Sequence, residues 1–65
     1  MACWFLHVET PSIEHAIRLG ATDESVAVEA LNDAKKLIGH AGVVTVQNRL
    51  ALKGANIVAV WLAYE

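Results

Sequence analysis

The side chains that could carry out chemistry are few: one cysteine, three histidines and two serines. Cys3 lies in an apolar segment without a cationic neighbour in the sequence, which favours a packed thiol over a nucleophile. Ser12 and Ser25 are interpreted as a turn residue and a helix-start residue. Because nucleophilic catalysis needs a base and an orienting group beside the nucleophile, we expect no catalytic residue and no enzymatic activity.

The histidines do not form a predicted site. If the first two segments are strands, His7 and His15 point to opposite faces, and His40 follows the predicted helix. Cysteine and histidine show no paired ligand spacing, so we expect neither a metal nor another cofactor. The later glycines also form no phosphate-binding pattern between a strand and a helix; they are Gly39, Gly42 and Gly54.

The chain is short and apolar. Its 65 residues indicate one domain, residues 1–65, and a chain of this size buries only about 60% of its unfolded surface. A single cysteine excludes an internal disulfide, so oligomerisation is the expected source of additional stability. The hydrophobic fraction of 55% excludes intrinsic disorder, and the net charge of −2 argues against unspecific phosphate binding.

The apolar run 57–64 is far shorter than the roughly 20 residues of a membrane-spanning helix. No basic segment leads into an apolar one at the amino end, so a secretory signal is not expected. A lone thiol suits a reducing compartment. These features predict a soluble cytoplasmic protein.

Residues 2–9 alternate in the manner of a strand. Residues 11–20 fit a strand or a helix, and we favour the strand because a turn at Pro11-Ser12 would oppose the apolar residues of both segments. The expected pairs are Val8 with His15, Leu6 with Ile17, and Trp4 with Leu19; the same register places Glu9 opposite Glu14.

Residues 23–39 have the clearest helical period. Thr22 or Asp23 can cap the start, and Gly39 or Gly42 can end the helix in a left-handed conformation. The apolar stripe comprises Ala27, Ala30, Leu31, Ala34, Leu37, Ile38 and Ala41, with Glu24, Asp33 and Lys36 opposite.

The stretch 43–65 predicts a hairpin with a loop at residues 54–56. Its first strand would place Val44, Val46, Leu50 and Leu52 on one side, and its second would turn Ile57, Ala59, Trp61 and Ala63 outward. The predicted class is α+β, a β-β-α-β-β domain with a four-stranded antiparallel sheet and one helix on one face. The alternative is a β-α-α-β-β domain with three strands.

One helix covers only one side of such a sheet. The other side would expose an apolar patch formed by Phe5, Ile57, Ala59 and Trp61. Aromatic centres with charged rims are typical of protein interfaces. We therefore predict a non-enzymatic interaction module that self-associates through this face, most simply as a dimer, and binds a further protein.

Two other sets of residues support an alternative function. Three cationic side chains could contact phosphates while the aromatic side chains stack on bases; they are Arg18, Arg49 and Lys53. The chain has only five Lys and Arg residues against seven Asp and Glu, so we do not expect nucleic acid as a partner. An acidic helix face could imitate phosphates, as small inhibitors encoded by mobile elements do; it comprises Asp23, Glu24, Glu29 and Asp33. The order of elements around Ala21-Thr22-Asp23-Glu24 resembles that of antitoxin-like modules but assigns no functional residue. The alternative is therefore a small regulator or inhibitor, antitoxin-like or encoded by a mobile element, that acts on a nucleic-acid-handling complex.

Overall fold

The computed structural model describes residues 2–65 and has the predicted α+β class. Its elements in chain order are β1 (Trp4–Glu9), β2 (Glu14–Gly20), α1 (Glu24–Lys35), β3 (Val43–Val46), β4 (Leu50–Lys53), the short 3-10 helix η1 (Gly54–Asn56) and β5 (Ala59–Tyr64). The strands form two sheets, a three-stranded sheet in the order β2-β1-β5 and a two-stranded β3-β4 hairpin. The strand arrangement thus differs from the predicted single four-stranded sheet.

Residues 14–20 form a strand, as predicted, and pair with β1. Val8 faces His15, Leu6 faces Ile17 and Glu9 faces Glu14, so the predicted register is correct over most of the hairpin. The Thr10 backbone N–H donates to the Ile13 carbonyl at 2.9 Å, which closes the turn. The Thr10 hydroxyl also donates to that carbonyl at 2.8 Å. A side chain that bonds its own turn explains how Pro11 is accommodated there.

One pair at the open end of this hairpin differs from the prediction. Trp4 pairs with Gly20 instead of Leu19, because the register shifts between Trp4 and Phe5. Gly20 has a φ of 90°, a left-handed conformation that glycine adopts without a steric penalty. A bulge of this kind increases the local twist of the strand, and here it is confined to the β1-β2 pair.

The stretch 43–53 is two strands, not one. Gln47 and Asn48 both have a φ of 53°, the conformation that lets two residues reverse the chain between twisted strands. Val44 then faces Leu52, and Val46 faces Leu50. These four apolar residues share a side, as predicted, although they belong to a hairpin.

The last strand, β5, pairs with β1 instead of with the chain that precedes it. Val60 and Leu62 lie opposite Val8 and Leu6, so all four point to the same side of the sheet. The predicted outward orientation of Ala59, Trp61 and Ala63 is therefore correct. Ile57 and Val58 precede the strand and break the pattern: Ile57 is 4% exposed and Val58 is 56% exposed.

The helix begins at Glu24 and ends at Lys35, earlier than the predicted residue 39. Asp23 is the N-cap residue, and Gly39, with a φ of 81°, terminates the following turn. The predicted stripe is confirmed in its centre, where the buried residues are Ala27, Ala30 and Ala34. Alanines permit the close approach of a helix to a sheet because they project little beyond the backbone.

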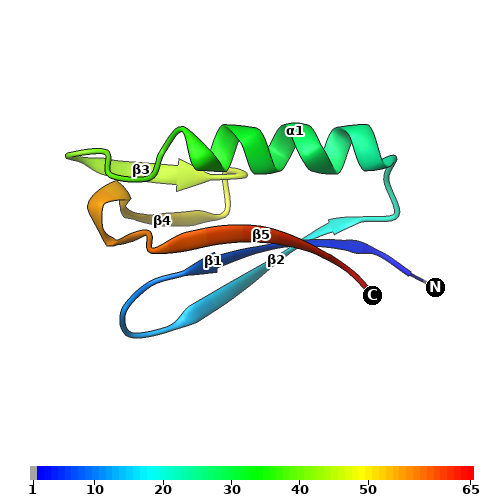
Figure 1. The fold of residues 1–65 in the computed structure, drawn as a ribbon, viewed down its shortest axis with the longest axis horizontal. Coiled ribbons are helices and arrows are strands. Elements are labelled where there is room, and N and C mark those ends of the chain that lie inside the picture. Colours follow the sequence, from blue (N-terminus) through cyan, green and yellow to red (C-terminus); the bar gives the residue numbers. More distant parts are fainter. Residues whose placement is uncertain (1) are drawn as a thin grey trace.

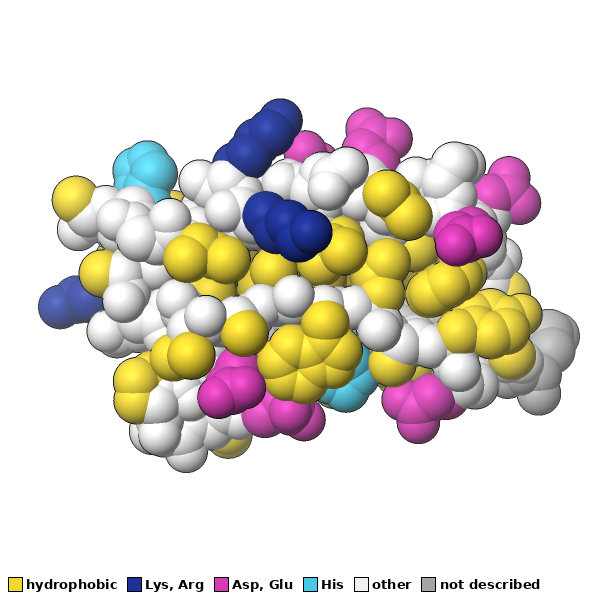
Figure 2. All heavy atoms as spheres, viewed as in Figure 1, with side chains coloured by type: hydrophobic (Ala, Val, Ile, Leu, Met, Phe, Trp, Pro, Cys, Tyr) yellow, Lys and Arg dark blue, Asp and Glu magenta, His cyan; other side chains and the backbone are white. Residues whose placement is uncertain are grey.

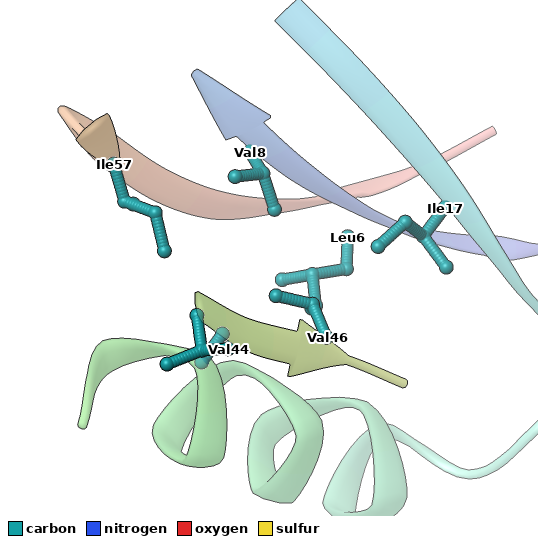
Figure 3. Close-up of a cluster of buried hydrophobic side chains, with 7 residues drawn as sticks. Leu6, Val8, Ile17, Val44, Val46 and Ile57 are labelled. Atoms are coloured by element: carbon teal, nitrogen blue, oxygen red, sulfur yellow. The ribbon is translucent and has the colours of Figure 1, made fainter. Parts of the chain in front are cut away.

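Two layers build the molecule (Figure 1). The three-stranded sheet is one layer, and α1, which lies over β1 and β5, belongs to the second with the β3-β4 hairpin. Figure 3 shows Leu6, Val8 and Ile17 of the sheet pointing toward Val44 and Val46 of β3. Leu6 and Val8 are fully buried, so the inner face of the sheet carries the core. Within residues 2–65, no helix combines the length and the hydropathy needed to cross a bilayer.

Candidate interaction surface

The side of the three-stranded sheet that points away from the core is called the outer face below. The strand registers place nine residues on it in three rows, Phe5 with Arg18 and Ala63, His7 with Ala16 and Trp61, and Glu9 with Glu14 and Ala59. The core and the partly buried side chains that pack on it belong to the opposite side, with α1 and the β3-β4 hairpin. No helix or strand of residues 2–65 covers the outer face.

The predicted apolar patch is assembled in part. Phe5, Ala59 and Trp61 share the outer face through the β1-β5 register and are each partly exposed. Ile57 is absent from this face, because it precedes β5 and packs in the core with Leu6 and Val8. Ala63 takes part instead, opposite Phe5.

An aromatic pair occupies the centre of the outer face. The His7 imidazole and the Trp61 indole are stacked, with centroids 5.2 Å apart and planes within 4° of parallel. The two residues are direct cross-strand neighbours, the arrangement that brings such rings into contact. His7 keeps 14% of its side chain exposed.

The ring nitrogens of His7 are buried and have no hydrogen-bond partner. The nearest charged group is the Glu14 carboxylate, with Oε2 at 3.6 Å from Nδ1, beyond hydrogen-bonding distance. Buried polar atoms are normally paired, and an unpaired one costs about 1–3 kcal/mol. The centre of the outer face is thus an apolar stack with unused hydrogen-bonding capacity beneath it.

The histidines do not converge. His7 lies on the outer face, whereas His15 faces Val8 on the inner side, as the predicted register requires. His40 is exposed in the turn after α1, where its backbone packs against Gly54. A Cβ on Gly54 would lie 2.5 Å from His40 Cβ and from the Leu37 carbonyl oxygen, which explains the glycine there. Among residues 2–65, no three His, Cys, Asp or Glu side chains are grouped as metal ligands would be.

The three predicted cationic contacts are split. The Arg18 guanidinium donates from Nη2 to Cys3 Sγ at 3.2 Å, and the Arg49 guanidinium donates from Nη1 to the Arg18 carbonyl at 2.6 Å. Lys53 lies at the opposite end of the β3-β4 hairpin from Arg49, because it pairs with Val43. The Arg18–Cys3 contact was not anticipated from the sequence, in which the two residues are 15 positions apart.

The predicted acidic helix face is also split. All four of its members are exposed: Asp23, Glu24, Glu29 and Asp33. Glu29 and Asp33 lie one turn apart and line a shallow groove with Gln47 of the β3-β4 turn. Glu24 lies on the opposite flank of α1, since each residue advances the helix by about 100°. The four carboxylates therefore do not present one phosphate-like row.

Comparison with known proteins gives no relative for this chain: no protein-family model, no curated protein and no solved structure matches it.

Proposed function

We propose that this protein is a non-enzymatic, cytoplasmic interaction module that self-associates through the β5 side of its outer face and binds a further protein with the rest of that face. The observation that carries the proposal is the uncovered stack of Trp61 on His7. A large aromatic side chain at the centre of an apolar patch is the common anchor of protein interfaces. The free thiol of Cys3 is consistent with a reducing compartment.

The composition of the outer face supports a protein partner. Phe5, Trp61, Ala59 and Ala63 provide apolar contact, and Glu9, Glu14 and Arg18 lie on the neighbouring positions. Charged residues around an apolar centre are typical of interfaces between proteins.

Light scattering of the wild-type protein tests self-association. We expect the molar mass to rise from that of one chain toward that of two between low and high micromolar concentration, because the small core gains stability from additional buried apolar surface. A mass of one chain throughout this range contradicts the self-association part of the proposal.

The second candidate is a regulator or inhibitor that contacts nucleic acid or occupies its site on a partner. One observation favours it, namely that the Arg49 guanidinium reaches the backbone carbonyl of Arg18, a residue of the outer face. The separation of Lys53 from them and the net charge of −2 weigh against it.

Titration with a labelled single-stranded oligonucleotide separates the two candidates. We expect no saturation in the micromolar range at low ionic strength. If Arg18 and Arg49 each neutralised a phosphate, the slope of log affinity against log salt would be about −1.4, from about −0.7 per contact on single strands. Saturable binding with that slope, weakened in Arg49→Ala, would favour the second candidate instead.

A further inference from the structure

The two edges of the three-stranded sheet differ in how they are protected. The β2 edge is partly closed, because Arg49 bonds the outward-pointing Arg18 carbonyl and the β3-β4 hairpin lies beside it. This strand also carries the charged side chains Glu14 and Arg18, and its pairing with β1 contains the bulge. Charges, bulges and covering segments are the devices that keep an edge strand from pairing with another chain.

The β5 edge has none of these devices. Residues 59–64 contain no charge and no proline, and their register with β1 is regular. Cys3 and Glu65 exchange both backbone hydrogen bonds, so alternate residues of β5, beginning with Ala63 and Trp61, bond to β1. The backbone groups of Val60, Leu62 and Tyr64 therefore point away from β1. Among residues 2–65, no hydrogen bond outside the sheet ladder reaches them.

The helix flank above this edge is self-complementary in charge. The groove lined by Ala30, Asp33 and Leu37 faces the β3-β4 turn, so the opposite flank of α1 lies on the β5 side. At 100° per residue, that flank carries Glu24 at its start, Val28 and Leu31 at its middle and Lys35 at its end. Val28 is 40% exposed. Hydrophobic side chains form a band over α1 and β5 in the face shown in Figure 2.

We propose that β5 pairs antiparallel with β5 of a second copy, about a two-fold axis at Leu62, and joins the two three-stranded sheets into one. This inference rests on the self-association proposed above and assigns its surface. A strand whose two copies run antiparallel is complementary to itself, since each outward N–H meets an outward carbonyl. The occupant that this edge fits is therefore another copy of the same chain.

The position of the axis follows from the hydrogen bonds. An axis at Leu62 pairs Leu62 with its copy and Val60 with Tyr64 of the second copy, so every outward group of the strand is used. An axis at Trp61 would leave Tyr64 without a partner, because the Val58 N–H is already bonded to the Glu9 carbonyl at 2.8 Å. On the outer face, the chosen register sets Trp61 beside Ala63 of the second copy.

The second layer fits the same axis. Adjacent strands are about 4.8 Å apart, so a helix that lies over β1 and β5 comes to about 10 Å from its copy, the usual spacing of packed helices. α1 and β5 run alongside each other in Figure 1, so the two helices are antiparallel about the axis. With the axis at the middle of α1, Glu24 lies opposite Lys35 of the second copy, and Val28 lies opposite Leu31. The pairing of opposite charges at both ends fixes this orientation.

Matched substitutions at the two edges test the inference. Ala63 on β5 and Ala16 on β2 are both outer-face alanines of edge strands. We expect Ala63→Glu to weaken the dimer at least about 30-fold in sedimentation velocity, the effect of losing an interface anchor, because the longer charged side chain would disrupt the contact with Trp61 of the second copy. Ala16→Glu should leave the dissociation constant within about 3-fold of the wild type, as a surface change does.

Oxidative cross-linking tests the axis in variants whose circular dichroism matches the wild type. We expect Leu62→Cys to form a disulfide-linked dimer, since residues that face each other across antiparallel strands are within disulfide reach. Ala16→Cys should not cross-link, and the buried Cys3 is common to both proteins. A dimeric wild type with equal effects of the two glutamates, or with no preference for cross-linking at residue 62, overturns the edge pairing and leaves self-association standing. A monomeric wild type overturns both the edge pairing and self-association, and the β5 edge would then be available to a strand of another protein.

Discussion

The substitution Trp61→Glu is expected to convert the protein from dimer to monomer at concentrations where the wild type is dimeric. Trp61 is the largest side chain on the outer face, and the proposed pairing places it between His7 of its own chain and Ala63 of the second copy. Loss of an aromatic anchor from an interface costs about 2–4 kcal/mol, or roughly a 30- to 1,000-fold weaker association. A charge left unpaired in the same place adds to that cost.

Two controls separate assembly from folding in this experiment. Trp61→Phe keeps a ring that can stack on His7 and should remain largely dimeric. Ile13→Glu introduces the same charge at a side chain that is 55% exposed in the β1-β2 turn, and should not alter the molar mass. If Trp61→Glu dimerises as tightly as Ile13→Glu, Trp61 is not in the interface.

The amino-terminal half of the fold was predictable because two independent patterns agree there. Alternation in residues 2–9 and in residues 11–20 defines an inner face on each strand, and only a turn at Pro11-Ser12 sets those faces opposite each other. A one-residue slip would expose both sets, so the register is strongly determined. The single error, at Trp4, comes from a bulge next to Gly20 that alternation does not report.

The helix was predictable in position and face but not in length. Its period locates Ala27, Ala30 and Ala34 correctly in the core. The period continues beyond Lys35, and Leu37 does pack against the core, but it does so from a turn that ends at Gly39. Of the other stripe residues predicted beyond the helix, Ile38 and Ala41 are exposed, because the chain leaves the helical path there.

The carboxyl-terminal half shows what local patterns omit. Gln47-Asn48 is not the Asn-Gly or Asp-Gly pair that usually announces a tight hairpin, so the chain reversal there was missed. Val44 and Leu52 remain on one side in either arrangement, and alternation cannot distinguish the two. The partner of β5 is set by long-range packing, since the paired residues of β1 are 50 to 60 positions distant along the chain.

The residues of the candidate site were likewise predictable where they depend on local alternation and not where they depend on long-range strand pairing. Phe5, Ala59 and Trp61 were placed on one face because alternation within each strand is local. The stack of His7 on Trp61 and the contact of Arg18 with Cys3 were missed because they depend on which strands are neighbours and on their register. The predicted set of cationic phosphate contacts was wrong for the same reason, since the fold separates Lys53 from Arg49.

Amide hydrogen exchange of the wild-type protein, followed residue by residue by NMR at low and high concentration, tests whether β5 pairs with a second copy. We expect the N–H groups of Val60, Leu62 and Tyr64 to exchange rapidly in dilute solution. Each should slow by about 15-fold when the total chain concentration is about 100 times the dissociation constant, because exchange then requires the dimer to dissociate and only about 7% of the chains are monomeric.

Other amides provide the internal references. The N–H groups of Trp61 and Ala63 bond to β1 and should be protected at every concentration, whereas that of Ala16 points outward from β2 and should remain fast. Protection of Val60, Leu62 and Tyr64 that rises with concentration while Ala16 stays unprotected is the predicted result. Exchange at these three β5 positions that is as fast as at Ala16 at every concentration would contradict the pairing of β5 with a second copy.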